Sequence, residues 1–261
     1  MLELHEVTQI FFRHTANEKV ALDKLSLTLT EGDFVTVIGS NGAGKSTLLN
    51  VVAGEQRPVS GTVSIDDRNV TRLPVHKVAR YVGRVFQDPT AGTMPHGTIE
   101  QNLAMAWARG RRRGLRRAVT RAKREIFRAE LARLELGLED RMRTDAGLLS
   151  GGQRQALSLL MAAFTGPRLL LLDEHTAALD PARAALVIRL TRELVERHGL
   201  TTLMVTHNMQ QALSMGNRLI MMHEGRIIHE LAGAAKQQAT VEDLLRQFEK
   251  IKAVSDRTLL S

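Results

Sequence analysis

Short apolar runs recur along the chain and predict strands that alternate with helices. Three of the runs carry no charged residue and are typical of strands buried on both faces: Phe34–Ile38, Leu169–Leu172 and Leu200–Val205. The segments around them predict helices over residues 46–52, 153–164, 181–198 and 208–215. Strand–helix alternation of this kind predicts an α/β fold, with a parallel sheet and helices on its faces.

The N-terminal part of the chain has a different pattern. Residues 2–8 and 20–30 alternate well enough between apolar and polar positions to be strands. Residues 61–65, followed by Asp66 and Asp67, resemble one limb of a hairpin with its turn. These segments predict an antiparallel β subdomain at the N-terminus.

The middle of the chain is mostly helical and carries few strand signals. Helices are expected over residues 98–108 and 116–136, and the region lies between two strand-rich halves. We therefore expect an inserted α-helical subdomain over about residues 88–165. In the second helix, apolar residues at steps of three and four predict one apolar stripe: Val119, Ala122, Ile126 and Ala129.

The C-terminal part predicts two closing strands and a last helix. The strands are expected over residues 218–222 and 226–229, and the helix begins at Thr240. Neither a repeat nor a Ser/Pro-rich linker divides the chain. We expect a single domain over residues 1–250, followed by a tail over residues 251–261.

Composition limits the classes of protein that fit this pattern. The 261 residues include 43% apolar residues, enough for a sizeable core, and there are no cysteines, which excludes disulfides and thiolate metal sites. Residues 1–12 lack a basic stretch followed by an apolar run, so no signal peptide is expected. The run Leu169–Leu172 is far too short to span a bilayer. A function at a membrane therefore requires a separate membrane-spanning partner.

The net charge of +8 is concentrated in one segment. Residues 109–133 contain 11 Lys or Arg and 2 Asp or Glu, a local charge of +9, whereas the rest of the chain has a net charge of −1. This distribution argues against a nucleic-acid-binding surface along the whole chain. The segment is either a solvated helix face with a charged loop or a contact for anionic lipid headgroups. RNA binding is a weaker alternative, since Phe127 is its only aromatic residue.

The first chemical motif is a glycine-rich loop between an expected strand and an expected helix. It reads G-x-x-x-x-G-K-[ST] and consists of Gly39, Ser40, Asn41, Gly42, Ala43, Gly44, Lys45, Ser46 and Thr47. Small residues let backbone N–H groups surround phosphate oxygens, and the helix N-terminus favours negative charge. Lys45 can reach the β- and γ-phosphates of a nucleotide, and Ser46 can bind Mg²⁺.

The second motif is a pair of carboxylates at the end of a buried strand. Asp173 and Glu174 follow Leu169–Leu172 directly, and ligands of open α/β sheets gather at the carboxyl ends of the strands. Asp173 can hold Mg²⁺, directly or through water, and Glu174 can act as a general base on the attacking water. Together the two motifs predict a P-loop nucleotide hydrolase.

A third motif indicates the family. It lies shortly before the strand of Asp173 and reads Leu149-Ser150-Gly151-Gly152-Gln153. The serine hydroxyl and the unhindered N–H groups of the glycines stand at a predicted helix start, so they can bind a second anion. With Gln87, Asp180 and His207, it resembles the ABC ATPase family over nearly the whole chain. The resemblance implies two ATP molecules, each sandwiched in a head-to-tail dimer between Gly39–Thr47 of one copy and Ser150–Gln153 of the other.

The resemblance also implies roles for single residues. Gln87 matches the Q-loop glutamine, which senses Mg²⁺ and the attacking water and faces the transmembrane partner. Asp180, in Ala178-Leu179-Asp180, matches the D-loop at the dimer interface, and His207 matches the switch histidine that contacts the γ-phosphate. Phe11 stands where the family places an aromatic residue that stacks on adenine; Phe12 and a purely structural role for Phe11 remain alternatives.

Two positions depart from the family pattern. His175 follows Glu174 where relatives often have proline, and Ala178 stands where they often have serine in the D-loop. Neither change removes a catalytic group, so hydrolytic activity is still expected.

Within the family, the arginine-rich insertion and neighbouring motifs are similar to those of a bacterial group of importer ATPases. The resemblance implies a permease, an extracytoplasmic solute-binding protein of lipoprotein type, and solutes such as tryptophan or related aromatic amino acids. It places the chain peripherally on the cytoplasmic face of the membrane. Alternatives are the ATPase of an exporter, an ABC ATPase that acts on nucleic acid or ribosomes, and a regulator that does not hydrolyse ATP.

Overall fold

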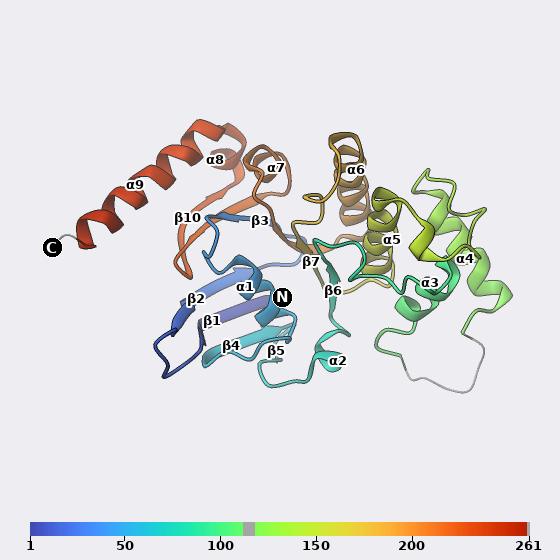
Figure 1. Cartoon of the computed structure of the whole chain (residues 1–261), viewed down its shortest axis with the longest axis horizontal. Coiled ribbons are helices and arrows are strands. Elements are labelled where there is room, and N and C mark those ends of the chain that lie inside the picture. Colours follow the sequence, from blue (N-terminus) through green and yellow to red (C-terminus); the bar gives the residue numbers. More distant parts are fainter. Residues whose placement is uncertain (112–117, 260–261) are drawn as a thin grey trace.

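Two sheets form the frame of the protein (Figure 1). The computed structural model describes residues 1–111 and 118–259, and the side chains of these residues as far as Lys250. The larger sheet has six strands in the order β10 (Arg226–Ala232), β9 (Arg218–His223), β3 (Phe34–Gly39), β8 (Thr201–Val205), β7 (Leu169–Asp173) and β6 (Val82–Val85). The smaller sheet has four strands in the order β2 (Lys19–Leu29), β1 (Leu2–Phe11), β4 (Ser60–Ile65) and β5 (Arg68–Asn69).

The directions of the strands confirm the fold class expected from the sequence. In the larger sheet β6, β7, β8, β3 and β9 run parallel, and β10 pairs antiparallel with β9. The pairs of the smaller sheet are antiparallel. The chain is therefore an α/β protein with a mostly parallel sheet and an antiparallel N-terminal β subdomain.

The helices cover the larger sheet and extend the molecule at both ends (Figure 1). They are α1 (Lys45–Val52), α2 (Val75–Val78), α3 (Ile99–Trp107), α4 (Arg121–Ala132), a 3-10 helix (Ala146–Leu148), α5 (Gly151–Ala163), α6 (Pro181–His198), α7 (Met209–Ser214), α8 (Gly233–Gln238) and α9 (Val241–Leu259). In Figure 1, α3 and α4 lie at one end of the molecule and α9 at the opposite end. Helix α9 includes residues 251–259, which the sequence suggested as a tail.

The parallel sheet separates two large apolar cores. Because successive side chains of a strand point to opposite faces, Leu169 and Leu171 of β7 pack with α1 and the antiparallel sheet, whereas Leu170 and Leu172 pack with α3 to α6. All four side chains are fully buried. This double burial explains why the strand contains no polar residue before Asp173.

The apolar stripe predicted for α4 is wrong. Of its four residues, Ala122, Ile126 and Ala129 are exposed, whereas Val119, which precedes the helix, is half-buried against the core. The helix instead buries Phe127 and Leu131 completely. The ring of Phe127 lies 6.1 Å from the rings of both Trp107 and Phe164, in edge-to-face geometry. One phenylalanine and one leucine remove more apolar area from water than one isoleucine and two alanines, so they decide which face turns inward. The helix is also shorter than predicted and begins after the cap Thr120.

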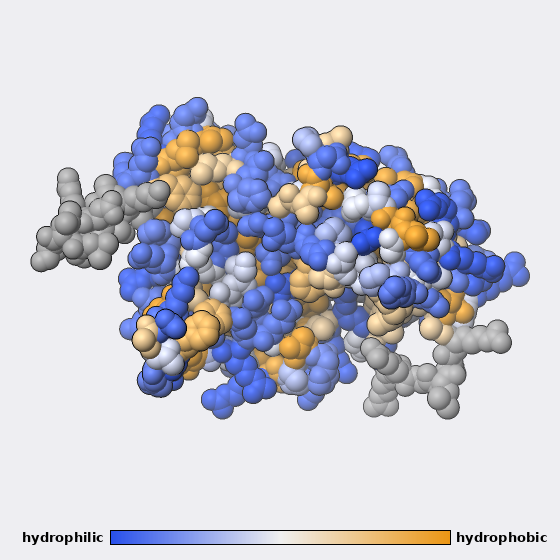
Figure 2. Space-filling model, viewed as in Figure 1, coloured by the Kyte–Doolittle hydropathy of each residue, from blue (hydrophilic) through white to orange (hydrophobic). Residues whose placement is uncertain are grey.

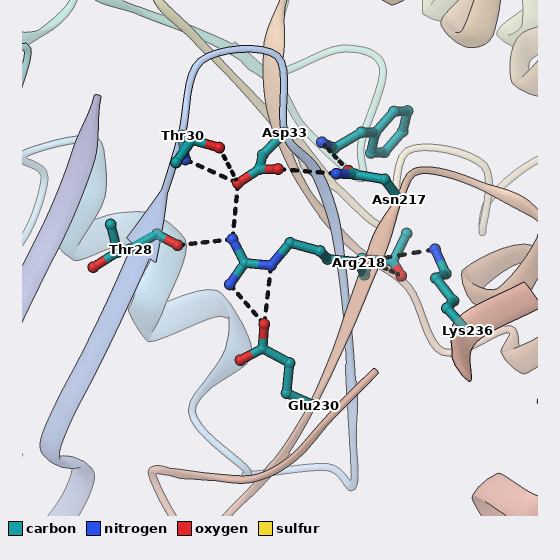
Figure 3. A network of polar contacts seen from close by, with 9 residues as sticks. Thr28, Thr30, Asp33, Asn217, Arg218, Glu230 and Lys236 are labelled. Atoms are coloured by element: carbon teal, nitrogen blue, oxygen red, sulfur yellow. Dashed lines mark hydrogen bonds and ion pairs between the residues drawn. The ribbon is translucent and has the colours of Figure 1, made fainter. Parts of the chain in front are cut away.

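A network of charged and polar side chains ties the two sheets together (Figure 3). The guanidinium of Arg218, on β9, donates to the carbonyl oxygen of Thr28 on β2, to Asp33 Oδ2 and to Glu230 Oε1. Asp33 also accepts hydrogen bonds from Thr30 and Asn217. Burial raises the pKa of Asp33, but these hydrogen bonds outweigh burial, so its pKa lies below the usual value. The network fixes the antiparallel sheet relative to β9 and β10.

No helix in the described part of the chain is both long enough and apolar enough to cross a bilayer. On the face shown in Figure 2 most of the surface is hydrophilic, and apolar side chains form separate patches.

Candidate nucleotide-binding site

The glycine-rich loop connects β3 to α1 in a conformation that requires glycine. Gly44 has φ +97°, and a Cβ atom there would lie 2.3 Å from the carbonyl oxygen of Ala21. A Cβ atom on Gly39 would lie 2.4 Å from the carbonyl oxygen of Met222. The loop can therefore pack closely against the neighbouring backbone, and the N-terminus of α1 stays open to a ligand.

Lys45, the first residue of α1, turns its side chain back to the start of this loop. Its ammonium group donates to the carbonyl oxygens of Gly39, at 2.8 Å, and Ser40, at 3.0 Å, and the residue is buried. Burial lowers the pKa of Lys45, and the nearby carboxylates of Glu174 and Asp173 partly offset this effect. The structure thus holds a cation where the sequence predicted the phosphates.

A pocket of about 250 Å³ opens between the glycine-rich loop and the N-terminal sheet. Phe11 lies in its wall, whereas Phe12 is 70% exposed and does not line it. Of the two aromatic candidates, the structure therefore brings Phe11 to the loop. The lining consists of Phe11, Lys19, Ala21, Asn41, Gly42, Ala43, Gly44, Lys45, Ser46, Thr47 and Glu174.

The predicted carboxylates lie at the end of β7. Glu174 has a positive φ of 43°, a strained conformation for a residue with a side chain, and its N–H donates to the carbonyl oxygen of Val205 at 3.0 Å. Its Oε2 atom lies 3.3 Å from Nδ1 of His207, whose side chain is 62% exposed. The structure therefore brings Glu174 and His207 together beside the pocket.

The donors at the site fit Mg²⁺ better than a metal held by protein ligands alone. No cluster of three or more His, Cys, Asp or Glu suited to a metal occurs in the described residues. Mg²⁺ typically takes one or two carboxylates and keeps water and substrate phosphates as its other ligands. The Asp173 carboxylate can supply the single carboxylate ligand, and the Ser46 hydroxyl, exposed at the pocket, can supply a neutral oxygen beside it.

The remaining predicted residues lie outside this pocket. Gln87 follows β6, the strand next to β7, and is exposed. Ser150 and Gln153 form a capping box at the start of α5: the Ser150 hydroxyl accepts from Gln153 N at 3.3 Å, and Gln153 Oε1 accepts from Ser150 N at 3.2 Å. A Cβ on Gly151 would be 3.6 Å from Leu179, and one on Gly152 would be 3.1 Å from Arg183. The third motif therefore packs against the segment of Asp180, away from the glycine-rich loop of the same chain.

Asp180 caps helix α6. Its Oδ1 atom accepts a hydrogen bond from Arg183 N at 3.1 Å, and Oδ2 lies 3.1 Å from Arg183 Nε. The Asp180 side chain stays half exposed at the start of the helix.

His175 turns away from Glu174. It is fully buried, and burial lowers its pKa to about 4, so the imidazole is neutral at pH 7. Its Nε2 atom lies 2.9 Å from Thr191 Oγ1, and that hydroxyl donates to the carbonyl oxygen of Val187. The imidazole must therefore donate to Thr191, which fixes the proton on Nε2. His175 adds no positive charge next to Glu174.

Two neighbours of the site were not predicted from the sequence. Lys19 pairs with Phe11 across strands β1 and β2 and lines the pocket. Arg84, on β6, binds the carboxylate of Asp173 at 3.0 Å. A charge within the short apolar segment Val82–Val85 was the available signal for Arg84, whereas Lys19 looks like any surface lysine.

The sequence matches known proteins over most of its length. The model of the family described as ABC transporter matches residues 22–177. A tyrosine transport ATP-binding protein of Clostridioides difficile is 41% identical over 95% of this chain and 99% of its own length. The spermidine/putrescine import ATP-binding protein PotA of Bacillus cereus is 36% identical over 86% of this chain, which spans 64% of that protein.

Solved structures agree with this assignment. A dimeric structure of the ATP-binding cassette MJ0796 in a post-hydrolysis state, bound to ADP and Pi, has 29% identity and a TM-score of 0.75, covering 89% of this chain and 98% of that one. The ADP conformation of the cassette MJ1267 has 25% identity and a TM-score of 0.78, covering 95% and 98%. The chain therefore belongs to the ABC transporter family, as one of its ATP-binding and ATP-hydrolysing members.

Proposed function

We propose that the chain powers an importer for an aromatic amino acid or a related small organic solute. The pocket that joins Phe11, the glycine-rich loop and Glu174 carries the hydrolytic part of this proposal. Two parts of the proposal rest on the names of relatives. Import is proposed because relatives are named for spermidine/putrescine and methionine import, and an aromatic solute because one relative is named for tyrosine transport.

The residues around the pocket suit the separate tasks of ATP hydrolysis. Phe11 stacks on adenine, while the loop N–H groups and Lys45 hold the phosphates. Ser46, Asp173 and Gln87 hold Mg²⁺, which when bound neutralises phosphate charge. Glu174 accepts a proton from the attacking water, and His207, 3.3 Å from it, orients Glu174 and contacts the γ-phosphate.

The working unit in this proposal is a pair of chains. Ser150–Gln153 lie outside the pocket of their own chain, so a second copy in head-to-tail orientation brings them to the bound ATP, with Asp180 at the interface. The pair docks on a transmembrane permease at the cytoplasmic face of the membrane, and the permease receives solute from an extracytoplasmic binding protein. We assign residues 1–250 to one ATPase domain, with a helical subdomain over about residues 88–165 and a C-terminal extension from residue 251.

Replacement of Glu174 by Gln tests the hydrolytic assignment. The amide cannot accept the proton, so we expect steady-state hydrolysis to fall by about 10²- to 10⁴-fold while ATP binding persists. Glu224→Gln is a matched control, because Glu224 also has a positive φ, 45°, but lies in the exposed turn between β9 and β10. Normal turnover by the Glu174→Gln variant would show that the base is another group.

We further propose that part of the basic segment 109–133 contacts anionic lipid beside the permease. The charges of this segment give the physical reason, since each cation near an anionic surface adds to the attraction.

Several cations of the segment already contact other residues of the chain. Arg109 donates to the carbonyl oxygens of Met161 and Ala162, and Arg111 lies 4.3 Å from the Trp107 ring. Arg124 and Arg133 pair with Glu100 and Glu130. The lipid contact thus falls to the remaining arginines, most of them among residues 112–117, which lie outside the described part of the chain.

A further inference from the structure

Arg84 lies between two carboxylates that come from different elements. Its Nη2 atom donates to Asp173 Oδ2 at 3.0 Å, and Nη1 lies 2.8 Å from Oε2 of Glu55, in the turn after α1. The guanidinium carbon lies 4.8 Å from the centroid of the Phe86 ring. The side chains of Arg84 and Asp173 are only 10% and 14% exposed. The guanidinium is therefore held by a hydrogen bond to Asp173, by charge attraction to the more exposed Glu55, and by the ring. Its Nε and Nη1 atoms are buried without a hydrogen-bond partner among the described residues.

This contact restrains the carboxylate that the proposed Mg²⁺ site depends on. Arg84 occupies Oδ2 of Asp173, whereas no hydrogen bond or ion pair joins Oδ1 to any residue that the structure describes. A carboxylate held through one oxygen cannot rotate freely about its last torsion, so the other oxygen keeps a defined position. Hydrogen-bonding partners of metal ligands commonly have this effect.

We propose that Arg84 is a positioning residue that orients Asp173 and leaves Oδ1 for the Mg²⁺ that accompanies ATP; this inference rests on the proposed Mg²⁺ site. The planar fork of an arginine can bind two carboxylates at once, whereas the ammonium group of a lysine is a single point of charge. Arg84 is thus suited to join Asp173 at the end of β7 to Glu55 after α1.

Glu55 removes the obvious objection to a cation beside a metal site. Arg84 alone would cancel the charge of Asp173 and weaken the attraction for Mg²⁺. With Glu55 included, the cluster of Glu55, Arg84 and Asp173 has a net charge of −1, the same as an isolated Asp173. Arg84 can therefore orient the ligand without reducing the local negative charge.

The charge balance also defines the test. The double variant Arg84→Met with Glu55→Gln removes the contact to Asp173 but keeps the cluster at −1, so only orientation changes. Binding of a fluorescent ATP analogue to the full chain is measured in EDTA and across a Mg²⁺ titration. We expect the affinity in EDTA to stay within about twofold, and the Mg²⁺ concentration at half-maximal effect to rise about tenfold. Arg168→Met is the control, because Arg168 forms a more exposed ion pair with Asp66.

Each outcome bears on the role of Arg84. An unchanged or lower Mg²⁺ requirement in the double variant overturns it, and so does an equal loss of affinity with and without Mg²⁺, which would mean a purely structural contact. If thermal melting shows that the double variant is unfolded, Arg84→Lys decides: a rise of about threefold or more in the Mg²⁺ requirement supports the role, and no rise overturns it. Nucleotide binding by the unaltered chain that ignores Mg²⁺ would instead refute the proposed Mg²⁺ site itself.

Discussion

Glu174 and His175 are neighbours in the chain but lie in opposite environments. Glu174 borders the nucleotide pocket with a positive φ, and His175 lies in the core against Thr191 of α6. A residue in the left-handed region redirects the chain abruptly, which allows consecutive side chains to face a ligand and the core. The sequence predicts Glu174 as a site residue from its place after an apolar strand, but it could not show where His175 points, because that depends on α6.

The buried His175 should make the protein sensitive to acid. Its pKa is about 4 in the folded state, against 6.5 for an ordinary histidine, so the folded state binds fewer protons. This contribution to stability is complete above about pH 6.5 and is lost as the pH falls towards 4, amounting to about 3 kcal/mol in the free energy of unfolding.

Replacement of His175 by Gln isolates this effect. Gln can still donate to Thr191 but does not titrate. The free energy of unfolding of the variant should therefore decline less steeply between pH 6.5 and 4 than that of the unaltered chain. Urea titrations at several pH values measure the two curves. Parallel curves would show that His175 does not take up a proton on unfolding in this range.

At the scale of elements, the short strand runs were more informative than the helical periodicity. The charge-free runs around Leu169–Leu172 and Thr201–Val205 predicted buried strands correctly, because burial on both faces leaves no position for a charge. For α4 the periodicity gave the wrong face, since steps of three and four count positions and ignore side-chain size. The short elements β5, β6, α2 and α8 were missed, because they are too short to develop a pattern.

Adjacent substitutions in α4 test which face stabilises it. Phe127→Ala should lower the free energy of unfolding by about 3–5 kcal/mol, because it leaves a cavity beside Trp107 and Phe164. Ile126→Ala, at a side chain that is 41% exposed, should cost no more than about 1 kcal/mol. Chemical denaturation of both variants gives the comparison. Equal losses would mean that the apolar stripe predicted from the sequence is buried after all.

At the scale of the whole molecule, the sequence predicted the two sheets but not their connection. Arg218 joins Thr28 and Asp33 to Glu230, which come from opposite ends of the chain. Local sequence patterns cannot predict a contact between segments so far apart in the sequence. The strand order of the larger sheet was equally out of reach, since a single sequence reports which segments are strands but not which strands meet. The charge distribution, in contrast, can be read directly from the sequence.

The uneven charge predicts salt-sensitive binding to anionic vesicles. Replacement of Arg112, Arg113, Arg116 and Arg117 by Gln should weaken co-sedimentation with phosphatidylserine-containing vesicles at least tenfold, since each cation near the surface contributes about 1 kcal/mol. An equal loss of charge elsewhere, in exposed Lys24, Arg57, Arg72 and Lys77, should have little effect. Equal weakening by both sets would attribute binding to net charge alone, and binding that ignores salt would contradict an electrostatic contact.

The position of β3 in the sheet has a consequence for synthesis on the ribosome. Strand β3 ends at Gly39, but its two neighbours β8 and β9 begin at Thr201 and Arg218, more than 160 residues later. At about 5–20 residues per second, the strand that carries the phosphate loop waits roughly 10–30 s for its first partner. A nascent chain therefore cannot hold the loop in its final shape until most of the protein has been made. ATP can therefore stabilise the folded chain only at the last stage of translation. Until then, the apolar side chains of β3 are shielded from water only by the N-terminal sheet or by a chaperone.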